Sequence, residues 1–342
     1  MTFAFAPDRR SRMRGKGMPE IYQRVRGFLF YADSDRWLSL LRIGLGLQIT
    51  LYTLSLRHDW SYLFATNAHG PIRRVLTEAI LSSQTRLTPR LGWLVNCGTY
   101  LGATEEMTLR FAWACLFITG CCLLVGLFCR SAAVLAWFLY LCSVKSGALL
   151  SYGVDNFTTI GLFYLMIAPL PDRLSVDSRI WASISIDPIR FGFHRRVLQL
   201  HLCLIYSFSG IAKCVGSDWW NGTSVWRALT RPPFDLLPPE FLVRFDYLLP
   251  VIGIFICVLE TGYPVCIWIR PVRRVWLAGI VGMHLSIGLT MGLYLFSLIM
   301  IVLNLAAFAP NGAAATKKAL LFRRRRDDSR SAERRTALEG SP

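Results

Sequence analysis

Charged residues are scarce in this sequence. They make up 17% of its 342 residues, whereas a soluble domain of this size has about 25%. Hydrophobic residues make up 54% and aromatic residues 13%, against the ~45–50% apolar content of soluble chains. This balance excludes an ordinary soluble domain and indicates a helical membrane protein with several spans.

Paired cysteine motifs and metal-ligand spacings are also missing. None of the ten cysteines forms a Cys-x-x-Cys motif, and the five histidines are scattered, so no metal site is expected. Most cysteines lie in apolar stretches, where a thiol packs as a small hydrophobe. Cys97 and Cys214 lie in or beside outer loops, and whether they pair in an oxidising compartment stays open. Residues 1–20 lack the apolar core of a removable signal peptide.

Eight apolar stretches approach the ~20 residues that cross the hydrocarbon core of a bilayer. The sequence therefore predicts an all-α polytopic membrane protein with about eight transmembrane helices. One membrane domain, 37–310, is flanked by a basic arm, 1–36, and a basic tail, 311–342. The predicted spans are 37–56, 109–129, 132–150, 157–170, 197–213, 248–269, 275–290 and 292–309.

The positive charge follows the predicted topology. The net charge is +17, and 26 of the 38 Lys and Arg residues fall on one side of the spans if the N-terminus is cytoplasmic. This is the positive-inside pattern. We therefore expect a multi-pass protein of the cell (inner, cytoplasmic) membrane with both termini cytoplasmic, where they bind anionic lipid headgroups. The same distribution argues against nucleic acid as a partner.

The longest connection, 57–108, is predicted to be an outer loop. Apolar residues recur at helical spacing over 71–84, which predicts an amphipathic helix at the membrane surface. The tryptophan-rich segment 217–229 is expected at the lipid–water interface, where this residue is enriched.

Polar residues inside apolar spans are costly, so each is a candidate functional position. Arg42 lies about one turn from the end of its span, and a side chain that snorkels to water explains it. Lys145 is expected to pair with Asp155 or Glu260, as a structural or a functional pair. Asn304 is expected to bond to another helix.

Lys213 lies at the end of the fifth span and has two open interpretations. Tyr206 and Lys213 are seven residues apart, which places them about 20° apart on one helix face, and Gly210 thins that face. A lysine sheltered by apolar walls is a candidate general base, although a nearby acid would oppose this role. The alternative is a helix-end charge that snorkels into water.

Three stretches resemble one family. YSFSGIAKCVGSDWWNG (206–222) resembles the Tyr…Gly-x-x-Lys…Asp-Trp-x-x-Gly pattern of the HTTM (horizontally transferred transmembrane) domain family, whose best-known relatives are the vitamin K-dependent gamma-carboxylases. The region 156–177 ends in a similar Ser-Val-Asp, and in 284–310 a His is followed twelve residues later by Phe. The resemblance covers nearly the whole membrane domain and implies its helical fold.

The resemblance also implies a site. In the carboxylases the lysine of this motif is the base that deprotonates a reduced quinone. It therefore implies Lys213 as the catalytic base and a reduced, menaquinone-like quinone as cofactor. Tyr206, Asn156, Glu260 and His284 are then expected to line or tune the pocket.

Two differences from the carboxylases affect the expected reaction. The carboxylases have a histidine where this sequence has Asn156, and they continue into a large outer domain where the basic tail follows here. Carboxylation of protein glutamates is therefore not implied. The first expectation is a quinone-dependent, carboxylase- or oxygenase-like lyase. The alternative is a non-catalytic membrane partner in the maturation or export of a secreted peptide. A transporter is less favoured, because paired halves and matching broken helices are not visible.

Overall fold

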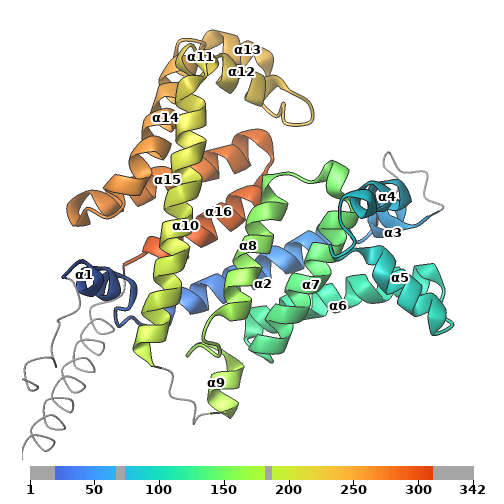
Figure 1. The fold of residues 1–342 in the computed structure, drawn as a ribbon. Coiled ribbons are helices and arrows are strands. Elements are labelled where there is room, and N and C mark those ends of the chain that lie inside the picture. Colours follow the sequence, from blue (N-terminus) through green and yellow to red (C-terminus); the bar gives the residue numbers. More distant parts are fainter. Residues whose placement is uncertain (1–19, 67–73, 182–186, 311–342) are drawn as a thin grey trace, which may run out of the picture.

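The computed structural model describes residues 20–66, 74–181 and 187–310, and within these ranges the regular structure is entirely helical (Figure 1). Eight long helices match the predicted spans in order. They are α2 (Arg36–Ser55), α6 (Glu105–Val125), α7 (Cys129–Ser146), α8 (Gly153–Ile167), α10 (Pro188–Val215), α14 (Leu248–Cys266), α15 (Arg270–Met291) and α16 (Tyr294–Phe308). The shorter helices are α1 (Glu20–Leu29), α3 (Trp60–Phe64), α4 (Arg74–Gln84), α5 (Leu91–Tyr100), α9 (Val176–Ile180), α11 (Ser217–Trp220), α12 (Thr223–Thr230) and α13 (Pro239–Arg244).

Five of the long helices are long and apolar enough to cross a membrane, namely α2, α6, α10, α14 and α15. These helices confirm the prediction of a helical membrane protein. The other three fall short for different reasons. Helices α8 and α16 have only 15 residues each, and the 18-residue α7 carries Arg130 and Lys145.

Helix α16 lies at the centre of the bundle, where its buried residues form part of the apolar core (Figure 1). It packs against α2 and α8 on one side and against α10 and α15 on the other. On the first side α6 packs on α2, and α7 lies between α6 and α8. On the second side α14 packs along α10. Helix α16 therefore lies between two groups of long helices. One group is α2, α6, α7 and α8, and the other is α10, α14 and α15.

Helix α10 begins at Pro188, well before the predicted start at 197. The Asp187 side chain accepts from the backbone N–H of Ile189 at 2.9 Å and caps the helix, with proline at its first position. This combination is a common helix start. The predicted start of this helix was too late because the first turns of α10 contain basic residues, which interrupt the apolar run.

Arg195 joins the two ends of the described bundle. Its guanidinium pairs with Asp33 at 3.0 Å and donates to the carbonyls of Ala307, at 2.9 Å, and Ala309, at 2.6 Å. Asp33 precedes α2 and Ala309 follows α16. The two ends of the helical domain therefore lie at the same face of the bundle.

The expectation that Arg42 snorkels to water is wrong. Its side chain is 0% exposed and forms a 2.5 Å ion pair with Asp172, which is equally buried. Its guanidinium also donates to the carbonyls of Leu123, at 2.5 Å, and Leu124, at 3.1 Å. These carbonyls belong to the last turn of α6, where helical partners are lacking. Arg42 therefore locks α2, α6 and the segment after α8 together.

The connection 57–108 contains three helices, α3, α4 and α5, where the sequence predicted one. Helix α4 covers 74–84 of the predicted amphipathic helix, and residues 71–73 lie outside the described ranges. Its apolar side chains are exposed, while Arg74 and Thr77 are buried against the protein. Arg74 donates to the Phe64 carbonyl at 2.6 Å and pairs with Glu105 at 2.5 Å. The polar face of α4 therefore packs inward. The exposed apolar residues are Val75, Leu76 and Ile80.

Candidate functional site

Lys213 lies in the last turn of α10 and is held by a carboxylate. Its Nζ donates to Glu260 Oε2 on α14 at 2.5 Å and to Ser209 Oγ at 2.6 Å. The Lys213 side chain is 20% exposed and that of Glu260 is 7% exposed. The Trp219 ring lies 5.3 Å from Nζ and adds a cation–π contact. Lys213 is therefore a half-sheltered ion-pair partner and does not extend freely into water.

A close approach of two backbones brings this pair together. A Cβ on Gly210 would lie 2.6 Å from the backbone nitrogen of Thr261 and 2.9 Å from the carbonyl carbon of Glu260. Only glycine permits such a contact without displacing one of the helices. Helices α10 and α14 therefore touch one turn before Lys213, and the lysine reaches the carboxylate across the short gap.

A buried hydrogen-bond network lies beside the ion pair. The Tyr206 hydroxyl bonds to His284 Nε2 at 2.9 Å and accepts from Asn304 Nδ2 at 2.8 Å. The Tyr263 hydroxyl donates to Asn304 Oδ1 at 2.7 Å. All four side chains are buried, and they come from α10, α15, α16 and α14. The expected bond from Asn304 to other helices is confirmed.

His284 retains one unused polar atom. Its Nδ1 is buried and has no hydrogen-bond partner among the described residues. The Phe296 ring packs against the imidazole in an edge-to-face arrangement, with the ring centroids 5.7 Å apart. Buried polar atoms are nearly always satisfied, so an orphan requires an explanation. His284 Nδ1 is therefore a candidate ligand contact next to the ion pair.

The structure thus brings together four of the five predicted site residues, Tyr206, Lys213, Glu260 and His284. Asn156 does not join them, because its side chain is exposed on the first turns of α8. Among the described residues, this part of α8 is linked to the site indirectly, through aromatic rings. Phe157 packs against Phe296 at 6.1 Å between centroids, and Phe296 packs against His284 at 5.7 Å.

The sequence analysis missed two members of the site. Ser209 lies one turn before Lys213, and its position on the same helix face was visible in the sequence. Tyr263 follows Glu260 by three residues and lies on the face of α14 that packs against α10 and α16, which only the fold shows. Its ring packs 4.2 Å from that of Tyr206, centroid to centroid.

The two partners expected for Lys145 are engaged elsewhere. Glu260 pairs with Lys213, and Asp155 accepts from the Tyr140 hydroxyl at 3.0 Å and from the Tyr152 backbone N–H at 3.1 Å. Lys145 forms no ion pair with the residues that the structure describes. It is a half-buried lysine without the carboxylate environment of Lys213.

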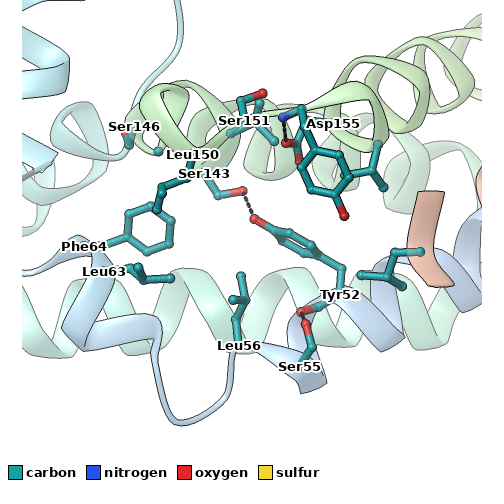
Figure 2. A pocket seen from close by; sticks show the side chains of 15 residues that line it. Tyr52, Ser55, Leu56, Leu63, Phe64, Ser143, Ser146, Leu150, Ser151 and Asp155 are labelled. Carbon is teal, nitrogen blue, oxygen red and sulfur yellow. Dashed lines mark hydrogen bonds between the residues drawn. The ribbon is translucent and has the colours of Figure 1, made fainter. Parts of the chain in front are cut away.

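A separate cavity of about 250 Å³ lies where α2 and α7 end and α8 begins (Figure 2). Figure 2 shows Tyr52 and Asp155 on its wall. The Tyr52 hydroxyl donates to Ser143 Oγ at 3.4 Å. A 150 Å³ cavity holds benzene, so this one holds roughly ten non-hydrogen atoms. The lysine site does not line this cavity. The remaining wall is largely apolar and includes Leu56, Leu63, Phe64, Leu150, Val154 and Leu295.

Within the described ranges, no group of three or more His, Cys, Asp or Glu side chains is placed to hold a metal ion. Comparison of the chain with models of protein families, with curated proteins and with solved structures finds no match. The function must therefore be argued from the motifs and from the geometry of the site.

Proposed function

We propose that the chain is a membrane enzyme of the HTTM type that deprotonates a reduced, menaquinone-like quinone, with Lys213 as the base. The observation that carries this proposal is the Lys213–Glu260 pair, joined at 2.5 Å and partly open at Lys213. Lys213 lies in the stretch 206–222 that resembles the lysine motif of the quinone-dependent carboxylases.

The side chains around the pair suit a hydroquinone, which is a flat apolar ring with two hydroxyl groups. The amine–carboxylate pair accepts a proton from one hydroxyl group. His284 Nδ1 is a buried polar atom without a protein partner and is suited to bond an oxygen of the ligand. The rings of Trp219 and Phe296 are the nearby apolar surfaces. A bound hydroquinone would supply two electrons to the reaction.

Glu260 determines how Lys213 acts as a base. A protonated amine cannot accept a proton, so Lys213 must first pass the proton of Nζ to another group. Separated charges become costly when water is excluded, and a ligand that covers the exposed part of Lys213 excludes it. The proton then moves from Nζ to the Glu260 carboxylate, and the neutral amine accepts a proton from the ligand. Glu260 is therefore the internal proton acceptor of the pair.

Tyr206 is assigned a positioning role. Its hydroxyl is already bonded to His284 and Asn304, and its side chain is only 2% exposed. It therefore acts on a ligand through the orientation of the His284 ring. The assignment of Asn156 to the pocket stays a prediction, because its exposed side chain does not join the network.

We further propose that all eight long helices cross the membrane, with both termini cytoplasmic in the inner membrane. Fifteen residues of α-helix span roughly 22 Å, less than the ~30 Å hydrocarbon core. Helices α8 and α16 nonetheless pack between neighbouring long helices, and local thinning of the bilayer accommodates a short span. The Arg195 contacts support an even number of crossings, since they hold the two ends of the domain together. The basic arms then face anionic lipid headgroups.

The test is menaquinol oxidation by the full chain in lipid nanodiscs with dioxygen as the electron acceptor, together with mass spectrometry of the lipids that co-purify. We expect bound quinone in the parent and a loss of ~10²–10⁴-fold in turnover for Lys213→Ala, the usual contribution of a general base. Lys145→Ala is the matched control and should retain turnover. Turnover of Lys213→Ala at the parent's rate would overturn the base assignment.

The alternative, a partner in the maturation or export of a secreted peptide, gives a different result in the same preparation. One defined protein would then co-purify with the parent and with Lys213→Ala alike, and menaquinol would not be oxidised by either.

A further inference from the structure

Two thiols face each other beside the candidate site. Cys214 on α10 and Cys257 on α14 occupy matching positions on two helices that meet at Gly210. Cys257 is 0% exposed, whereas Cys214 is partly exposed. Both are free thiols. Cys214 directly follows Lys213, and Cys257 lies one turn before Glu260.

The register of the two helices explains this pairing. Gly210 lies against Thr261 at the closest approach of α10 and α14. Because the helices are antiparallel, a step of four residues forward on α10 matches a step of four backward on α14. That step leads from Gly210 to Cys214 and from Thr261 to Cys257. The cysteines are therefore opposite each other one turn beyond the contact.

Two contacts between the helices flank Gly210. The rings of Tyr206 and Tyr263 pack with their centroids 4.2 Å apart, and Lys213 Nζ bonds to Glu260 Oε2 at 2.5 Å. Each joins a residue of α10 to one within two positions of its expected partner on α14, so the register holds on both sides of Gly210. A disulfide requires Cα atoms about 4.4–6.8 Å apart, and a glycine-mediated helix contact is where two helices come that close.

We propose that Cys214 and Cys257 form a reversible dithiol–disulfide centre that reacts by exchange with a small or protein disulfide. This pairing replaces the one that the sequence left open between Cys97 and Cys214. Cys97 lies on α5, which packs on α6 and α7, and Cys214 already has a thiol neighbour. The proposal does not depend on quinone chemistry.

The exchange proceeds in two balanced steps. Cys214, the partly exposed thiol, attacks one sulfur of the incoming disulfide as a thiolate, breaks its S–S bond and releases one thiol. Cys257 then attacks the Cys214 sulfur of the mixed disulfide and releases the second thiol. The two cysteines lose two electrons and two protons, and the incoming disulfide gains them. The new bond ties α10 to α14 directly beside the Lys213–Glu260 pair.

The test treats the full chain in nanodiscs with a dipyridyl disulfide, which is small and uncharged. Peptide mass spectrometry without reduction then locates the products. In the parent we expect an unlabelled peptide pair joined through Cys214 and Cys257. Cys97 is exposed and has no thiol partner in the structure, so it should retain one pyridyl label and serves as the internal control.

Two variants distinguish the roles of the thiols. In Cys257→Ser the second step is blocked, so a stable pyridyl label should remain on Cys214. In Cys214→Ser no cross-link should form, and buried Cys257 should stay unlabelled. The thermal midpoint of each variant, compared with the parent, checks its folding.

Two results would overturn the proposal. One is a pyridyl label on Cys214 of the parent with Cys257 free, since a facing thiol would have displaced it. The other is a cross-link from Cys214 to Cys97.

Discussion

Lys213 and Glu260 form an ion pair of 2.5 Å although they are 47 residues apart in the chain. Each side chain lies in a largely apolar stretch of its helix, where a lone charge would be costly. The pairing explains how both are tolerated. It also means that neither residue can be changed without leaving the other unpaired.

Replacing Glu260 by Gln tests this dependence. The unpaired ammonium should lower the free energy of unfolding by about 2–3 kcal/mol, less than the ~3–5 kcal/mol of fully buried pairs, because Lys213 is one-fifth exposed. Menaquinol turnover should fall ~10²-fold or more, since the proton acceptor is lost. Thermal unfolding and turnover measure the two effects.

The matched control is the double variant Lys213→Met, Glu260→Leu, in which both charges are removed. Apolar replacement of a whole pair is usually neutral or stabilising. The free energy of unfolding of the double variant should therefore return to about the parent's value, while its menaquinol turnover should stay as low as that of Glu260→Gln. Full turnover in Glu260→Gln would show that the carboxylate is not the acceptor.

Arg42 and Asp172 should form the strongest structural pair among the described residues, because both side chains are fully buried. Arg42→Ala leaves a buried carboxylate and the α6 carbonyls without partners, and should destabilise the protein by about 3–5 kcal/mol. The exposed Arg110–Glu106 pair is the control, and Arg110→Ala should change stability by less than ~0.5 kcal/mol. Urea unfolding of the detergent-solubilised variants compares them. Equal effects of the two substitutions would contradict the burial argument.

These pairs show what the sequence could and could not predict. Apolar runs predicted all eight long helices in order, because the pattern of apolar residues along the chain is the main local signal for a helix. Helical spacing put Tyr206, Gly210 and Lys213 on one face. Which carboxylate meets Lys213 depends on the antiparallel register of α10 and α14, which is a long-range property of the fold.

Arg42 shows the same limit more clearly. Its position near the end of a span fitted snorkelling, and its partner Asp172 lies in an irregular segment after α8. Hydropathy does not show where such a segment folds back. The sequence likewise could not show that the polar side of α4 faces the protein. Periodicity identifies an amphipathic helix but not the side that packs against the rest of the chain.

Tyr206→Phe tests the positioning of His284. The substitution keeps the ring that packs on Tyr263 and removes the hydroxyl that bonds His284 and Asn304. Two buried polar groups then lose a partner, which should cost about 1–3 kcal/mol. If His284 contacts the ligand, kcat/KM should also fall.

Tyr164→Phe is the control for this substitution. It removes a similar hydroxyl–imidazole bond, to His201 at 2.8 Å, outside the network. It should affect stability mildly and kcat/KM not at all. The same kcat/KM in Tyr206→Phe as in the parent would refute the positioning role.

The ion pair and the thiol pair both depend on the contact between α10 and α14 at Gly210. Gly210→Ala places a Cβ 2.6 Å from a backbone nitrogen of α14, so the helices must separate. We expect a lower thermal midpoint, slower menaquinol turnover and less Cys214–Cys257 cross-link. Gly282→Ala on α15 is the control, since a Cβ there meets nothing within 4 Å. Alanine favours a helix over glycine by about 1 kcal/mol, so this control should match or exceed the parent's stability. An undiminished cross-link in Gly210→Ala would mean that the helices do not meet at this residue.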